Sequence, residues 1–343
     1  PLLGDRQLRR GDEIITVAAA FPTTVAPIMQ VGAVPVFVDI DIPSYNMDMS
    51  MLEKAYSNKT KAVFIAHSLG NPFNLKAAKE FCDSHNLWLI EDNCDGLGGT
   101  YELDGVTYKT GTIGDIGTSS FYPAHQMTMG EGGAVYSSNP LLHKIIRSMR
   151  DWGRECVCTG GQDNLCGHRF DGQFGTLPAG YDHKYVYSHL GYNLKVTDMQ
   201  AAIGAAQLKK LPGFVKARQE HWDYLRAGLD DMKDYYILPE KEKSSEPCWF
   251  GFILTVKPES GKNRNEIVKF LEDNNIQTRN LFAGNITRHP CFEQFREGVD
   301  YRIAETLEVT DHVMNNSFWV GVYPGMTTPM LDEMIKKIKE AVQ

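Results

Sequence analysis

The chain has 343 residues, and its content of 42% hydrophobic and 23% charged residues is that of an ordinary globular protein. A chain of this length is expected to form two domains rather than a single core. The net charge of -8 argues against nucleic-acid binding, which needs a basic face. No apolar run reaches the roughly 18 residues needed to cross a membrane, and no signal-type N-terminus is seen, so we expect a cytoplasmic protein.

The first half of the chain alternates short β-rich runs with amphipathic helical runs. Strands are predicted for residues 13–19, 34–40, 61–67 and 87–92. Between them, helical apolar spacing is found in residues 23–32, 48–57 and 75–86. This alternation predicts an α/β fold with a mainly parallel central sheet covered by helices. Because the sequence begins at Pro1 in the middle of a pattern, we also expect the natural protein to have a further N-terminal piece.

The second half is predicted to lead from this sheet into a smaller α+β domain. A strand, a turn and a second strand are expected in residues 119–138, followed by a helix and a segment rich in Gly and Cys. Further predicted elements are the helices 140–153, 197–210, 213–229, 264–274 and 328–343 and the strand 248–256. We place the domain boundary near Leu211 and Pro212, which divides the chain into a large domain, residues 1–212, and a small domain, residues 213–343.

Three polar residues follow predicted strands, at the sheet edge where parallel α/β folds bind ligands. Asp92 follows the apolar run LWLI and could hold the ring nitrogen of a pyridoxal-type cofactor in its protonated form, or could simply cap a helix. Ser120 is suited to binding a phosphate. His125 stands five residues later and could be a packed structural histidine, a ligand or a catalytic base. The glycines at 130, 132 and 133 do not form a dinucleotide fingerprint.

The cysteines are distributed unevenly. Of seven, Cys156, Cys158 and Cys166 fall within eleven residues in the pattern C-x-C-x7-C, inside the segment 153–180. In a cytosolic protein such clustering favours a metal site over disulfides. Zinc and iron-sulfur clusters both use four thiolates, so the residues alone leave both possibilities open, although C-x-C-x7-C is unlike the paired knuckles of structural zinc sites.

Several stretches together resemble the sugar aminotransferase family of pyridoxal-phosphate fold type I enzymes. They are AAAFPTTVAPIMQVGAVPVFVDID, IEDNCDGLG, GDIGTSSFYPAHQMTMGEGGAVYS and GYNLKVTDMQAAIGAAQL, and the resemblance covers essentially the whole chain. In that family a lysine normally occupies the position of His125 and forms the Schiff base. A histidine there marks the sugar 3-dehydratases, which hold pyridoxamine phosphate without a covalent bond. The resemblance therefore implies a dehydratase.

The same resemblance implies roles for individual residues. Phe21 would stack on the cofactor ring, Asp92 would face its ring nitrogen and Ser120 would bind its phosphate. Asn193 would reach the phosphate of the neighbouring subunit's cofactor, which implies a homodimer. His125 would act as the base, and the further active-site wall would be formed by Asp95, Tyr122 and Phe250.

Within the family, FYPAH, RDWGRECVC and GYDHKYVYSHLGYNLK most resemble the members that act on CDP-4-keto-6-deoxyglucose in the synthesis of lipopolysaccharide dideoxysugars. That resemblance implies a [2Fe-2S] cluster on Cys94, Cys156, Cys158 and Cys166. It also implies a flavin-dependent iron-sulfur reductase as the electron donor. The alternatives are a cluster-free dehydratase acting on a GDP-sugar, an aminotransferase relative without activity, and a zinc-stabilised sugar-binding module.

Overall fold

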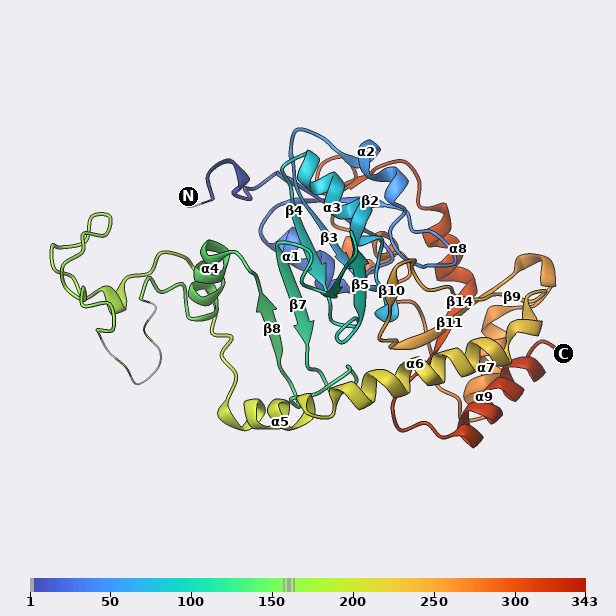
Figure 1. Cartoon of the computed structure of the whole chain (residues 1–343). Coiled ribbons are helices and arrows are strands. Elements are labelled where there is room, and N and C mark those ends of the chain that lie inside the picture. Colours follow the sequence, from blue (N-terminus) through green and yellow to red (C-terminus); the bar gives the residue numbers. More distant parts are fainter. Residues whose placement is uncertain (1–2, 157, 159–161, 163) are drawn as a thin grey trace.

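The computed structural model describes residues 3–156, 158, 162 and 164–343. A large sheet lies at the centre, a smaller sheet with its helices lies toward the C-terminus, and the chain following α4 extends away from both (Figure 1). No helix among the described residues is long and apolar enough to cross a bilayer.

The large sheet is mainly parallel, as predicted. Its strands, in spatial order, are β13 (Arg302–Ile303), β2 (Val34–Val38), β1 (Glu13–Val17), β3 (Thr60–Ala66), β4 (Trp88–Asp92), β7 (Ile116–Ser120) and β8 (Gly133–Tyr136). Only the last pair, β7 and β8, is antiparallel. All five residues of β1 are buried, as expected for a central strand of a parallel sheet whose two faces are covered by helices. The four predicted strands of the first half are confirmed, with ends that differ by one or two residues.

Five helices of the described chain surround this sheet, and two of them, α3 and α4, begin at asparagine caps. They are α1 (Pro22–Gln30), α2 (Leu52–Ala55), α3 (Leu75–Ser84), α4 (Pro140–Arg150) and α8 (Glu308–Asn316). The side chains of Asn74 and Asn139 accept hydrogen bonds from the first turns of α3 and α4. The helix predicted for residues 48–57 is much shorter, because a 3-10 turn at Met49–Met51 precedes the four residues of α2.

The smaller sheet has the order β12-β14-β11-β9 and is antiparallel. Its strands are β12 (Thr278–Arg279), β14 (Ser317–Gly321), β11 (Gly251–Val256) and β9 (Tyr236–Ile237). The accompanying helices are α6 (Leu211–Gly228), α7 (Arg264–Asp273) and α9 (Thr328–Glu340), whereas α5 (Asp198–Leu208) lies near β8 of the large sheet (Figure 1). Pro212 is the second residue of α6, a position where its missing N–H is tolerated.

Two main buried cores correspond to the two sheets, but the chain crosses between them. The second core takes its residues from Trp222 onward. The first core also takes in Leu281, Phe292 and Val313, and β13 pairs with β2. The boundary at residue 212 therefore stays a prediction, and residues 281–313 return to the large core.

A hairpin was not predicted. β5 (Thr100–Leu103) and β6 (Val106–Lys109) pair in residues for which no element was predicted, and β10 (Ser245–Glu246) adds to β5. The turn is formed by Asp104 and Gly105, both with positive φ, and an Asp-Gly pair is the usual signal for such a turn. Short 3-10 turns complete the fold at Gly4–Arg6, Met49–Met51, Ser68–Gly70, His183–Tyr185, Asp230–Met232, Pro258–Ser260, Ile286–Arg288 and Pro290–Phe292.

Candidate active site

The predicted site residues lie at the carboxyl ends of neighbouring parallel strands. Phe21 follows β1 and precedes α1, Asp92 ends β4 and Ser120 ends β7. His125 lies in the turn after β7, where its backbone N–H donates to the carbonyl of Tyr122. Because these strands run in one direction, their ends meet at one edge of the sheet. The structure thus brings together residues that are about 100 positions apart in the sequence.

Asp92 is buried and held by three donors. Its Oδ2 accepts a 2.7 Å hydrogen bond from the Thr24 hydroxyl, while Oδ1 accepts from the Cys94 N–H at 3.2 Å and the Thr118 hydroxyl at 3.4 Å. Only 7% of Asp92 is exposed. A carboxylate fixed in this way at a strand end is suited to one directed interaction with a cationic group of a ligand.

The residues at this edge fit a pyridoxal-type cofactor. The ring of Phe21 is 52% exposed and touches Phe282 only edge to face, at 6.3 Å between centroids, so it can stack on a planar ligand. The Ser120 hydroxyl accepts from the Tyr122 N–H at 3.2 Å and keeps its own proton available for an anion. An aromatic face, a buried carboxylate and a hydroxyl are the groups that such a cofactor's ring, ring nitrogen and phosphate require.

His125 and Asp95 form a pair beside these residues. His125 Nε2 lies 3.3 Å from Asp95 Oδ1, and both side chains are largely buried. Burial raises the pKa of the Asp95 carboxyl above its ordinary value, although the hydrogen bond from His125 acts in the opposite direction. Asp95 Oδ2 and His125 Nδ1 are both buried, and neither has a hydrogen-bond partner among the described residues. The pair therefore retains polar capacity for a ligand or a water molecule.

Aromatic rings and a cavity surround His125. Its ring lies 5.9 Å from that of Tyr122 and 5.5 Å from that of Phe250. A cavity of about 490 Å³ opens beside it, a volume in the range of ligand sites. Its lining includes His125, Arg218 and Phe250. Phe250 lines the cavity and Tyr122 contacts the His125 ring, and their role as an active-site wall stays a prediction.

A buried ion pair lies next to Asp92 at the end of β4, and its contacts were not predicted from the sequence. His67 Nε2 lies 3.0 Å from Glu91 Oε2, and both side chains are fully buried. Glu91 also accepts from the N–H groups of Gly111, Ile113 and Gly114 at 2.6–2.8 Å. Burial alone would raise the pKa of Glu91, but His67 and these backbone groups outweigh it, and the pKa lies below its ordinary value. Glu91 thus anchors the strand end that carries Asp92.

Arg218 is a second feature that sequence reasoning missed. This α6 residue is 3% exposed, lines the cavity beside His125 and donates through Nη1 to the carbonyls of Trp249 and Val322. Its guanidinium lies 6.0 Å from the ring of Phe250. Burial lowers the pKa of Arg218, whereas the Asp95 charge raises it. The only signal in the sequence is a single arginine on the buried face of an amphipathic helix.

The four cysteines predicted as metal ligands lie in two places. Cys94 follows Asp92, and its side chain lies near the Thr118 hydroxyl. Cys156, Cys158 and Cys166 lie beyond α4, where burial raises the pKa of the Cys156 thiol above its ordinary value. Residues 157, 159–161 and 163 of this segment lie outside the described chain. In the part that is described, no group of three or more His, Cys, Asp or Glu side chains is arranged to hold a metal ion.

Asn193 is exposed and lies apart from the His125 cavity. It forms an isolated bridge with Asp151 at the end of α4 and is not among the residues lining that cavity. Its predicted contact with a neighbouring subunit's cofactor stays a prediction.

Comparison with known proteins gives the family context. The chain is 56% identical to the lipopolysaccharide biosynthesis protein RfbH of Salmonella typhimurium, over 99% of this chain and 76% of that protein. It is 50% identical to the dTDP-4-dehydro-2,6-dideoxy-D-glucose 3-dehydratase of Saccharopolyspora spinosa, over 100% of this chain and 72% of that enzyme. Its relatives thus include sugar-nucleotide 3-dehydratases.

Solved structures agree with this. An E. coli GDP-4-keto-6-deoxy-D-mannose-3-dehydratase with bound hydrated PLP superimposes with a TM-score of 0.83 at 27% identity, covering 99% of this chain and 82% of that one. The predicted pyridoxal-phosphate-dependent fold is confirmed. Residues 3–339 match the model of the DegT/DnrJ/EryC1/StrS aminotransferase family. The chain therefore belongs to the DegT/DnrJ/EryC1/StrS aminotransferase family.

Proposed function

We propose that this protein is a pyridoxamine-phosphate-dependent dehydratase that removes the 3-hydroxyl of a nucleotide-linked 4-keto-6-deoxysugar. The observation that carries the proposal is His125. It lies in the turn after β7, at the position where the resemblance to the family's aminotransferases implies the Schiff-base lysine, and it is paired with Asp95. No lysine is found among the described residues that line the cavity beside it. A site without that amine cannot hold the cofactor covalently, but it can still transfer protons.

The chain's own residues can then perform the proton transfers. Pyridoxamine phosphate, when bound, would supply an amine for the 4-keto group and a ring that accepts electrons. Asp92 would hold the proton on the ring nitrogen. Asp95 is paired with Nε2 of His125, so Nδ1 is the nitrogen available for proton transfer. Nδ1 would accept a proton and then deliver one to the departing 3-hydroxyl, which leaves as water. Phe250 and Tyr122 would limit the access of bulk water.

Incubation with CDP-4-keto-6-deoxyglucose, pyridoxamine phosphate and a flavin-dependent reductase tests this function. We expect mass spectrometry to show a product that has lost the 3-hydroxyl, and we expect no product when pyridoxamine phosphate is omitted. Retention of the 3-hydroxyl with CDP-, GDP- and dTDP-linked 4-keto-6-deoxysugars alike would contradict the proposal.

We further propose that Cys94, Cys156, Cys158 and Cys166 hold a [2Fe-2S] cluster that a partner reductase supplies with electrons. The C-x-C-x7-C pattern supports this. In the described part of the chain, the side chains are not arranged as a metal site.

Metal analysis of anaerobically purified protein tests the cluster. We expect about two irons per chain together with visible absorption, the signature of a [2Fe-2S] centre. Cys166→Ser should lower the iron content, because it removes one proposed ligand. Cys291→Ser is the matched control, since Cys291 is also exposed but lies outside the pattern. Zinc alone, or equal iron in both variants, would rule out the proposed ligand set.

A second candidate is a dehydratase without a cluster, acting on a GDP-sugar. One observation favours it. The chain is 32% identical to the GDP-4-keto-6-deoxy-D-mannose 3-dehydratase of an E. coli O55:H7 strain, over 92% of this chain and 76% of that enzyme. Protein free of iron that dehydrates a GDP-linked sugar would select this candidate.

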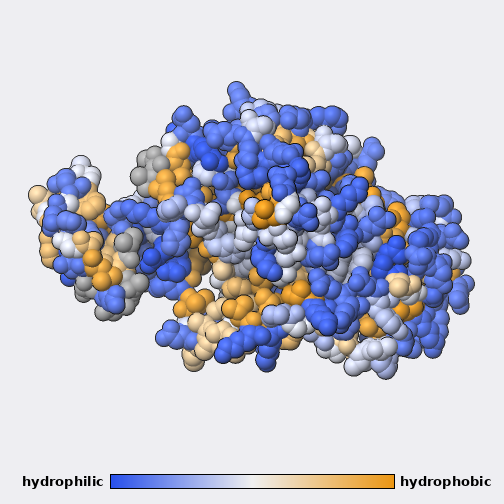
Figure 2. Space-filling model, in the orientation of Figure 1, coloured by the Kyte–Doolittle hydropathy of each residue, from blue (hydrophilic) through white to orange (hydrophobic). Residues whose placement is uncertain are grey.

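We propose that the enzyme acts as a homodimer. The segment before α5 and α5 itself carry large exposed apolar side chains, including Leu190 at 98% and Met199 at 76%. Figure 2 shows apolar side chains gathered over this part of the chain. Asn193 lies within the same segment, so a second subunit covering it could receive Asn193 at its own cofactor site.

A further inference from the structure

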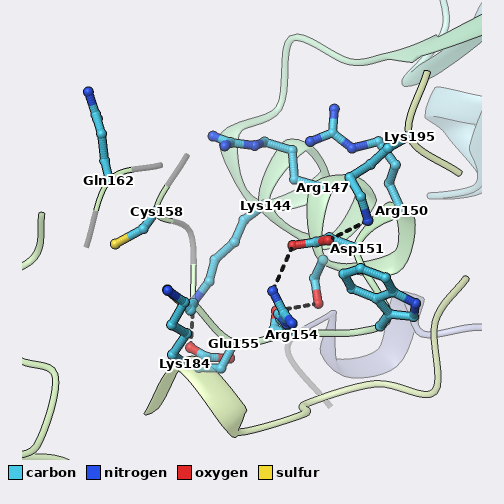
Figure 3. A pocket seen from close by; sticks show the side chains of 13 residues that line it. Lys144, Arg147, Arg150, Asp151, Arg154, Glu155, Cys158, Gln162, Lys184 and Lys195 are labelled. Carbon is cyan, nitrogen blue, oxygen red and sulfur yellow. Dashed lines mark hydrogen bonds and ion pairs between the residues drawn. The ribbon is translucent and has the colours of Figure 1, made fainter. Parts of the chain in front are cut away.

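Arg218 is a buried cation that forms no ion pair in the described part of the chain. Its side chain extends from α6 and is 3% exposed. Other cations are paired directly: beyond α4, Asp151 pairs with Lys195 at 2.9 Å and with Arg154 at 3.9 Å (Figure 3). Burying a charge without such a partner costs free energy. A neutral residue would therefore be less costly at this position unless the guanidinium makes contacts that only it can make.

The guanidinium binds two backbone carbonyls through a single nitrogen. Nη1 donates to the carbonyl of Trp249 at 3.0 Å and also to the carbonyl of Val322. Trp249 precedes β11 and Val322 follows β14, so both carbonyls lie just beyond the ladder in which Gly251 pairs with Gly321. Arg218 therefore joins the two strands at the point where their own pairing ends.

The residue held by this link is Phe250. Its N–H donates to the carbonyl of Leu69 at 2.8 Å, and its own carbonyl accepts from the Val322 N–H at 3.2 Å. The peptide group between Trp249 and Phe250 thus has both of its polar atoms bound, the carbonyl by Arg218 and the N–H by Leu69. Because these partners come from three separate segments, they fix the position of the Phe250 backbone.

The ring of Phe250 lies between the arginine and the proposed base. Its centroid is 5.5 Å from that of the His125 imidazole, with 45° between the two planes, and the guanidinium carbon of Arg218 is 6.0 Å from the same ring. Trp319 packs against Phe250 as well, with ring centroids 5.5 Å apart. A shift of Phe250 would therefore change the packing around the imidazole, since packed side chains leave little free space between them.

We propose that Arg218 is a positioning residue for dehydration, which fixes Phe250 and through it the orientation of the His125 imidazole. This inference rests on the proposed function. Asp95 restrains the imidazole at Nε2, and Phe250 restrains it at the ring. Arginine suits the role because its planar group carries several donors in a fixed geometry and keeps its charge when buried. Position matters here, because proton transfer requires the base within hydrogen-bond reach of the proton.

The position of His125 can be measured without substrate or cofactor. Diethyl pyrocarbonate modifies accessible imidazoles, and peptide mass spectrometry gives the rate at each histidine. In Arg218→Met we expect His125, whose side chain is 15% exposed, to react several-fold faster. His67 is fully buried and should stay protected, while His143 is exposed and should react at an unchanged rate. Lys216→Met is the matched control, because it removes an exposed cation from the same helix and should leave all these rates unchanged.

Turnover separates positioning from substrate binding. We expect Arg218→Met to lower kcat for the 4-keto sugar by about tenfold to a hundredfold, because a displaced base slows proton transfer. KM should change by less than about twofold, since the contacts that bind the substrate remain. Arg218→Met combined with Phe250→Leu should be no slower than Phe250→Leu alone, because the arginine acts through that ring.

Arg218→Gln is the second variant, because its amide can still donate to one carbonyl and should give a smaller effect at His125 if Arg218→Met does not fold. An unchanged modification rate at His125 overturns the proposal, and so do additive losses of kcat in the double variant. Equal acceleration at His67 and His125 in both variants also overturns it, because Arg218 would then support only the fold. If the unchanged protein dehydrates no 4-keto sugar, the proposed function fails, and the modification rates still decide whether Arg218 positions His125.

Discussion

Replacing His125 with asparagine is expected to reduce the rate of 3-dehydration by about 10² to 10⁴ while the protein still binds its cofactor. That range is the usual contribution of a positioned general base. Asparagine keeps a polar side chain near Asp95, which lies 3.3 Å from the imidazole, but it cannot accept and return a proton at neutral pH. The residues proposed to hold the cofactor, Phe21, Asp92 and Ser120, are unchanged. Turnover measured by mass spectrometry and cofactor retention measured by absorbance separate the two effects.

The matched control for this variant is His143→Asn. His143 lies on α4, is exposed and is not among the residues lining the cavity beside His125. We expect its turnover to equal that of the unchanged protein. If His125→Asn retained turnover within about tenfold of the original rate, histidine would not be the base.

Replacing Glu91 with glutamine is expected to destabilise the fold by about 2–4 kcal/mol at neutral pH. Glu91 is fully buried and accepts hydrogen bonds from three backbone N–H groups as well as lying 3.0 Å from His67. A glutamine amide would turn an N–H₂ group toward at least one of these donors. The midpoint of chemical denaturation at pH 7 measures the loss.

The effect of Glu91→Gln should depend on pH in a defined direction. The pKa of Glu91 is lower in the folded chain than its ordinary value of 4.5, so its ionised form stabilises the fold above that pH. As the pH falls below 4.5, this stabilisation is lost. The difference in unfolding free energy between the unchanged protein and Glu91→Gln should therefore narrow. Glu53→Gln is the control, because that carboxyl is 71% exposed and should shift the midpoint little. An equal difference in unfolding free energy between the two proteins at pH 7 and at pH 4 would contradict the predicted role of the ionised carboxyl.

The sequence predicted the elements whose pattern is local. Apolar runs such as VPVFV in β2 identified the parallel strands, because burial on both faces leaves little polarity in them. The hairpin β5–β6 was missed because its strands have only four residues each and β6 is exposed throughout. Strand β14 was also missed, since its place in the small sheet is determined by pairing with β11 and β12.

For the candidate site, the positions of residues at the strand ends were predictable from the sequence, but the contacts between their side chains were not. Asp92 and Ser120 could be placed at the ligand edge because each ends a predicted strand. The Asp95–His125 contact joins two loops, and the His67–Glu91 ion pair joins β4 to the residue after β3. Such contacts depend on the register of the sheet, which a single sequence does not reveal. The role of His125 followed only from its resemblance to a family in which lysine is expected.

The return of residues 281–313 to the large sheet has a consequence for the synthesis of the protein. Phe37 of β2 packs against Phe292 and Tyr301, with ring centroids 5.9 Å and 6.0 Å away, and β13 covers the edge of β2. A growing chain on the ribosome has all of β1, β2, β3 and β4 long before these partners emerge. The edge of β2 and the ring of Phe37 therefore stay uncovered through most of translation, and that edge needs protection from other nascent chains during this interval.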